Sequence, residues 1–201
     1  RRARLGPWEA NCYAVACRHT SESLVVDAPD DPDAILGLLD GTLPRYLLLT
    51  HDHPDHVLVL RELYEKLSVP LAVHPADAAN LAVPPDRLLA DGETLRLGTT
   101  TITVMHTPGH TPGSLCFYLP GFLLAGDTIF PGGPGKTFSP EGFRDILASI
   151  TGRIFTLPDE TAILPGHGDT ITVAEAKREY QAFAAGDHPD DLYGDVLWSG
   201  G

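Results

Sequence analysis

The segment from Thr50 to His56 concentrates side chains that bind metal ions. It directly follows a short apolar run and reads Thr50-His51-Asp52-His53-Pro54-Asp55-His56. Imidazole nitrogens and carboxylate oxygens are the usual ligands of a catalytic zinc ion. His51 and His53 can turn toward one metal, whereas the adjacent Asp55 and His56 can turn toward another. Taken alone, the segment is also compatible with a polar surface loop of stacked histidines.

Three further segments each place one ligand-type residue in a tight turn after an apolar stretch. His110 lies in the stretch 107–114, which is rich in Pro and Gly, Asp127 follows the run 122–126, and His167 follows Leu164-Pro165-Gly166. Functional side chains are commonly carried on loops that a rigid scaffold holds in place. The three segments therefore favour a metal site over an ordinary surface loop.

The elements that must position these residues follow from the apolar periodicity. The order of strands and helices indicates two sheets with helices packed outside them, an α/β fold of four layers, αββα. We expect one domain over residues 1–186 and a loosely held acidic C-terminal tail over 187–201. Strands are expected at 13–16, 24–26, 46–49, 71–73, 95–104, 115–119, 122–125 and 161–164, and helices at 32–40, 57–67, 140–150 and 173–183.

Composition narrows the classes of function. The chain has 201 residues, a formal net charge of −13 and 43% hydrophobic residues. This acidity disfavours a nucleic-acid partner, which usually selects a basic face. No apolar run is long enough for a membrane span, and the first residues lack the apolar stretch of a secretory signal, so we expect a cytoplasmic protein without a membrane partner. The three cysteines are irregularly spaced and predict no disulfide framework, and Cys116 is expected in the core.

Together these motifs resemble the metallo-β-lactamase superfamily, and its glyoxalase II-like branch in particular. The resemblance extends from the strand around Asn11 to the last predicted helix. It implies a metallo-β-lactamase fold that holds two divalent metal ions, with zinc favoured and iron or manganese as alternatives. It also implies the ligands: His51, His53 and His110 for one metal, Asp55, His56 and His167 for the other, and Asp127 bridging both together with a water or hydroxide.

The resemblance also implies an activity. A small-molecule ester-like bond, most simply the thioester of a small thiol, would be hydrolysed by the bridging hydroxide, and Asp55 would orient the metal-bound water. One alternative is a persulfide dioxygenase with a single iron held by two His and one Asp. Others are a lactonase or β-lactamase, or a metal-binding protein without activity. Neither the acyl group nor the oligomeric state follows from the sequence.

Several residues lie outside this pattern. Gly132-Gly133-Pro134-Gly135-Lys136-Thr137 lacks the first Gly of a phosphate-binding loop, so we expect a mobile loop in which Lys136 binds the substrate. His106 and Asp52 are weaker candidates for orienting a ligand, and His74 is expected to be structural.

Two features depart from the glyoxalase II pattern. Leu58 and Val59 stand where a pair of Gly is usual, so the backbone cannot approach its neighbours as closely there, and the shape of the pocket floor does not follow from the resemblance. Only residues 168–201 follow His167, too few for the C-terminal helical domain that binds glutathione in that family. Specificity for glutathione thioesters is therefore not supported.

Overall fold

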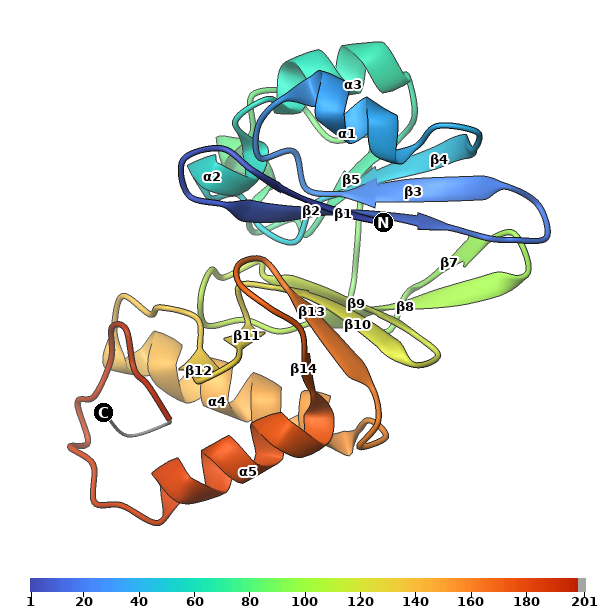
Figure 1. Ribbon diagram of the computed structural model, residues 1–201. Coiled ribbons are helices and arrows are strands. Elements are labelled where there is room, and N and C mark those ends of the chain that lie inside the picture. The colour runs from blue at the N-terminus through green and yellow to red at the C-terminus, as the bar shows by residue number, and fades with distance from the viewer. Residues whose placement is uncertain (199–201) are drawn as a thin grey trace.

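Two six-stranded sheets pack face to face, and helices cover their outer faces (Figure 1). The computed structural model describes residues 1–198. One apolar cluster fills the space between the two sheets. Each sheet has a further cluster between its outer face and the helices that cover it. The predicted αββα architecture is confirmed.

The N-terminal sheet has the strand order β1-β2-β3-β4-β5-β6. Its first three strands are antiparallel and the remaining pairs are parallel. Helices α1 (Pro32–Leu38) and α3 (Leu60–Leu67) cover its outer face in Figure 1. The strands are β1 (Arg2–Leu5), β2 (Ala10–Ala16), β3 (Glu22–Val26), β4 (Leu43–Leu48), β5 (Leu71–Val73) and β6 (Arg87–Leu88).

The C-terminal sheet has the order β14-β13-β10-β9-β8-β7. Only β10 and β13 pair in parallel there. Helices α4 (Pro140–Gly152) and α5 (Val173–Ala184) cover the outer face, and a small hairpin pairs β11 (Ile129–Phe130) with β12 (Gly133–Pro134). The strands are β7 (Thr94–Leu97), β8 (Thr100–His106), β9 (Leu115–Leu119), β10 (Phe122–Gly126), β13 (Ala162–Pro165) and β14 (Ile171–Thr172). Two short 3-10 turns, η1 (Ala78–Asn80) and η2 (Ile154–Thr156), complete the elements.

Side-chain caps fix where the C-terminal helices begin. The Ser139 hydroxyl accepts a hydrogen bond from the Gly142 amide at 3.0 Å, at the start of α4. Thr172 and Glu175 form the predicted capping box of α5, in which each side chain accepts from the other residue's backbone. The predicted starts of these two helices are confirmed.

The expected helix over 57–67 was wrong in its first turn. A short helix, α2 (Pro54–Val57), begins earlier. The helical structure is then interrupted at Leu58 and Val59, before α3 begins. The break has a physical cause: the Val59 amide donates to the Ala28 carbonyl at 3.1 Å. This bond ties the segment to the end of β3.

We expected the segment after residue 186 to be loosely held, but part of it is packed against the rest of the protein. Val196 is 8% and Trp198 2% exposed, and both belong to the apolar cluster beneath the C-terminal sheet. Their burial removes apolar surface from water, and the acidic character of the surrounding residues hid this from the sequence. Within residues 1–198, no helix has both the length and the apolar character needed to cross a bilayer.

Candidate metal centre

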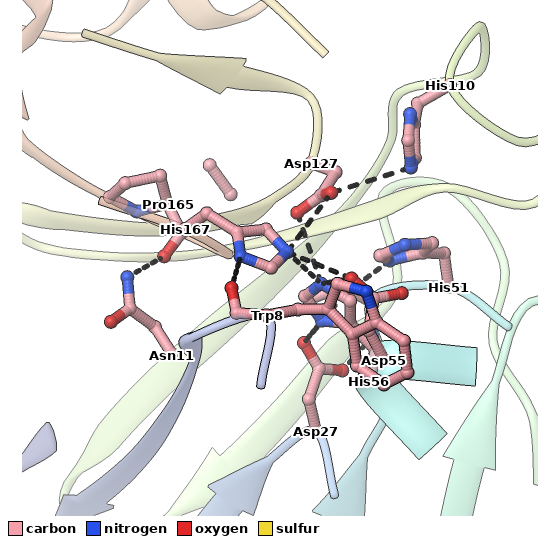
Figure 2. A network of polar contacts seen from close by, with 12 residues as sticks. Trp8, Asn11, Asp27, His51, Asp55, His56, His110, Asp127, Pro165 and His167 are labelled. Carbon is pink, nitrogen blue, oxygen red and sulfur yellow. Dashed lines mark hydrogen bonds and ion pairs between the residues drawn. The ribbon is translucent and has the colours of Figure 1, made fainter. Parts of the chain in front are cut away.

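The seven predicted ligands meet where four strands end. His51, His53, Asp55 and His56 follow β4, His110 follows β8, Asp127 follows β10 and His167 follows β13. Figure 2 shows six of them, all except His53, facing a common centre. Both sheets contribute, because the first four residues come from the N-terminal sheet and the last three from the C-terminal sheet.

One group consists of His51, His53 and His110. Each offers a ring nitrogen, and the three nitrogens lie within 4.8 Å of one another. The ring of His53 meets that of His110 edge to face, with centroids 4.5 Å apart. Such a set of imidazoles could hold one metal ion.

A second group consists of Asp55, His56 and His167, whose ligand atoms also lie within 4.8 Å of one another. His167 Nε2 is 3.1 Å from Asp55 Oδ2 and 3.3 Å from His56 Nε2. Two imidazoles and a carboxylate could hold a second metal ion.

Asp127 lies between the two groups. One carboxylate oxygen is 3.3 Å from His56 Nε2, and the other is 3.6 Å from His110 Nε2 and 3.7 Å from His167 Nε2. A single carboxylate therefore contacts members of both groups.

Several polar atoms in this centre are buried without a partner. His51 Nε2, His110 Nε2 and Asp127 Oδ1 make no hydrogen bond within the described residues. Unpaired buried polar groups are costly, so a natural protein pairs them with something. Gly166 also leaves no side chain next to these residues: a Cβ there would lie 2.1 Å from Asp127 Oδ1 and 2.7 Å from His56 Cε1. Divalent cations fit this donor set and would satisfy its unpaired atoms.

Asp27, at the end of β3, organises the histidines and was missed in the sequence analysis. His56 Nδ1 donates to Asp27 Oδ2 at 2.9 Å, and the amide and hydroxyl of Thr50 donate to the same carboxylate, each at 2.8 Å. Since the Thr50 hydroxyl hydrogen is used, its oxygen accepts from His51 Nδ1 at 2.9 Å. The one available signal was a lone Asp after the apolar run Leu24–Val26.

Backbone carbonyls orient two other imidazoles. His110 Nδ1 donates to the Lys136 carbonyl at 2.7 Å, and His167 Nδ1 donates to the Trp8 carbonyl at 3.0 Å. A histidine with its Nδ1 hydrogen engaged presents the Nε2 lone pair, which is the form that binds metals. The protein thus selects one tautomer for these rings.

Electrostatics differ between the two groups. Burial holds the pKa of His51 well below its ordinary value and also lowers that of His110. Burial opposes protonation of His56 too, but Asp127 and Asp27 outweigh it and raise the pKa well above the ordinary value. The hydrogen bond to Asp55 raises the pKa of His167, and the same bond lowers the pKa of Asp55 to about 2.

The weaker candidates lie apart from the seven residues. His74 and His106 stack on each other with centroids 4.0 Å apart, and His106 Nε2 donates to the Pro112 carbonyl. Asp52 accepts a hydrogen bond from Asn80 at 2.6 Å. None of these contacts reaches a ring or carboxylate of the seven residues.

Lys136 is half exposed, and its ammonium lies 3.5 Å from the Asp195 carboxylate and 5.9 Å from the centre of the Phe138 ring. The loop that carries it is hydrogen-bonded to the C-terminal segment through Gly132 and Thr137. The expected mobile loop is therefore a tethered one.

Known proteins resemble this chain in sequence. The model of the metallo-beta-lactamase superfamily matches residues 5–167. A probable metallo-hydrolase of Bacillus subtilis, YqgX, is 33% identical, and the match covers 86% of this chain and 92% of that protein. A hydroxyacylglutathione hydrolase of Klebsiella pneumoniae is 31% identical over 92% of this chain and 69% of its own length.

A solved structure extends the similarity. TTHA1623 in a di-iron-bound form superposes with a TM-score of 0.74 at 32% identity, over 89% of this chain and 97% of that one. That protein, which has nearly the same length and the same fold, was solved with two iron ions bound. The chain described here belongs to the metallo-β-lactamase superfamily, in the glyoxalase II-like branch of metal-dependent hydrolases.

Proposed function

We propose that this protein hydrolyses thioesters of small thiols with two divalent metal ions, zinc being the metal favoured. One observation carries the proposal: Asp127 contacts His110 of one group and His56 and His167 of the other. The similarity to a hydroxyacylglutathione hydrolase supports the thioester as substrate class.

We assign different roles to the residues of the centre. His51, His53 and His110 would hold one ion, Asp55, His56 and His167 the other, and Asp127 both. When bound, such ions supply Lewis acidity for the carbonyl and lower the pKa of water. Asp55, whose pKa of about 2 keeps it ionised, would accept a hydrogen bond from the attacking water and orient it.

A small-molecule substrate has a cleft available beside the centre. Pro108, Pro112, Phe138 and Asp145 line it together with His110. The Phe138 side chain is exposed there, and its ring centroid is 5.9 Å from that of His53. An acyl group in this cleft would lie next to the first group of histidines.

The test is metal analysis of protein purified without added metal, combined with assays on an S-acyl thioester, a lactone and a persulfide. We expect two zinc ions per chain and thioester hydrolysis. One iron per chain, with oxygen consumption on the persulfide and no hydrolysis, would replace the proposal by a dioxygenase. Hydrolysis of the lactone alone would replace the substrate class.

Lys136 is proposed to bind an anionic part of the substrate, because its ammonium is exposed and must only exchange Asp195 for another carboxylate. We expect Lys136→Ala to lower kcat/KM for an acidic thioester by the equivalent of about 1–3 kcal/mol and to spare a neutral one. Lys177→Ala is the matched control, since Lys177 lies on α5 and its ammonium pairs with the Asp159 carboxylate. Equal losses on both substrates would reject this role.

A further inference from the structure

The loop from Pro131 to Phe138, here called the glycine loop, lies directly against two residues of the metal centre. Its Lys136 carbonyl accepts the hydrogen bond of His110 Nδ1. A Cβ on Gly135 would lie 1.8 Å from the Asp127 carbonyl oxygen and 3.3 Å from His110 Nδ1. A displacement of this loop would therefore break the hydrogen bond that orients the His110 ring or the close contact with the Asp127 backbone.

The glycine loop is also bound by residues Gly194 to Trp198, here called the C-terminal strap. The Trp198 amide donates to the Gly132 carbonyl at 2.7 Å. At the other end, the Thr137 amide donates to the Gly194 carbonyl at 3.1 Å, and the Gly194 amide donates to Thr137 Oγ1 at 3.2 Å. The strap is thus bonded to both ends of the loop.

Contact between strap and loop is close in the middle as well. A Cβ on Gly133 would lie 2.6 Å from the Val196 carbonyl oxygen. This glycine also has φ +155°, so both the conformation and the space require the absence of a side chain. The loop is shaped to receive the strap.

Trp198 is the anchor of the strap. Its ring packs against Tyr180 with centroids 5.1 Å apart and against Phe155 and Phe183 at 6.3 Å each. By contrast, Leu197 is 69% exposed, and the Asp195 side chain contributes the exposed pair with Lys136. In Figure 1 the C-terminal segment turns back from the end of α5 toward α4 and β12.

We propose that the C-terminal strap is a positioning element of the His51–His53–His110 metal site. Trp198 is the positioning residue: it fixes the strap, the strap fixes the glycine loop, and the loop's Lys136 carbonyl fixes the His110 ring. The inference rests on metal binding by this group and is independent of the substrate. The segment that resembles an acidic tail in sequence thus acts on the position of the His110 ring through a series of contacts.

The test is the release of metal from the loaded protein to a chromogenic chelator, measured below the melting temperature of every variant. We expect Trp198→Ala to release one of its two metals per chain at least about tenfold faster than the unchanged protein does. An effect of this size is typical when a residue that orients a metal ligand is lost. The second metal should leave at the unchanged rate. Trp198→Phe should restore slow release, because Trp198 Nε1 makes no hydrogen bond to any residue of 1–198 and the aromatic contacts remain.

Two further variants make the result specific. Ile154→Ala removes a fully buried side chain from the same apolar cluster, so it lowers stability without cutting the strap. It should leave release unchanged. Thr137→Val removes one strap bond with almost no change in volume and should accelerate the same phase, even if Trp198→Ala folds poorly. Unchanged release in both Trp198→Ala and Thr137→Val, equal acceleration of both metals, or the same acceleration in Ile154→Ala would each overturn the proposal.

Discussion

Four of the five histidines in the metal centre have their Nδ1 atoms engaged by the protein. His51 and His56 are held through Thr50 and Asp27, and His110 and His167 through backbone carbonyls. This arrangement presents Nε2 atoms to the centre before any metal arrives, which reduces the entropy lost when one binds. The carboxylate of Asp127, which follows β10 of the C-terminal sheet, completes the centre.

At this scale we expect Asp127→Ala to lose at least one metal per chain and most of its activity, because one carboxylate contacts both groups of ligands. Metal content by mass spectrometry and the hydrolysis rate check this. Asp52→Ala is the matched control: it lies in the same segment as the histidines, but its carboxylate accepts from Asn80. Full metal content and normal turnover in Asp127→Ala would remove Asp127 from the centre.

Acidification should empty the two sites in order. A raised pKa means that the proton is held to higher pH, so protons compete earlier for His56 and His167. His51 and His110 have lowered pKa values and stay neutral to lower pH. We expect the metal content to fall from two to one and then to zero as the pH drops below about 6, and activity to fall with the first step. Metal content after equilibration between pH 8 and pH 4 is the measurement, and simultaneous loss of both metals would contradict the order.

At the scale of elements, the loops at the strand ends are shaped by close packing. Gly109, next to His110, has φ +136°, and a Cβ there would lie 2.4 Å from the backbone nitrogen of Ile146 in α4. The loop after β8 therefore rests directly on that helix. The side chain of Ser149 adds a hydrogen bond from α4 to the Pro108 carbonyl at 2.9 Å.

We expect Gly109→Ala to destabilise the protein by about 1–3 kcal/mol and to lower metal content, because the loop must move away from α4. Gly152→Ala at the end of α4 is the control, since a Cβ there meets nothing within 4 Å. That change should be neutral or slightly stabilising. Thermal unfolding and metal analysis of the two variants give the comparison, and equal melting temperatures would show that Gly109 has room for a side chain.

At the scale of the whole molecule, the metal centre joins the two sheets. Ligands after β4 belong to one sheet, and those after β8, β10 and β13 belong to the other. A metal held by both sheets binds the folded chain and not the unfolded one. Metal binding should therefore stabilise the packing of one sheet on the other.

Removing the metals with a chelator should lower the melting temperature by on the order of 5–10 °C, since metal at 100 times its Kd contributes about 2.7 kcal/mol. Calorimetry on the chelated protein, before and after two equivalents of zinc are restored, measures the shift. The shift in melting temperature should be smaller in Asp127→Ala than in the unchanged protein. An unchanged melting temperature in the native sequence would mean that the centre does not hold the sheets together.

The sequence by itself predicted the two-sheet architecture and the seven residues that the structure brings together. Apolar periodicity and capping residues are local properties, so the starts of α4 and α5 could be predicted. The spacing of His51, His53, Asp55 and His56 restricts them to one loop, and this too is local.

Only the tertiary structure decided what lies around those residues. Asp27 supports His56 although 29 positions separate them, because β3 and β4 are parallel neighbours and end at the same edge. The burial of Trp198 could not be read from an acidic segment, since it depends on three aromatic rings from other elements. Contacts of this kind depend on how distant segments pack, and no pattern within one segment encodes that packing.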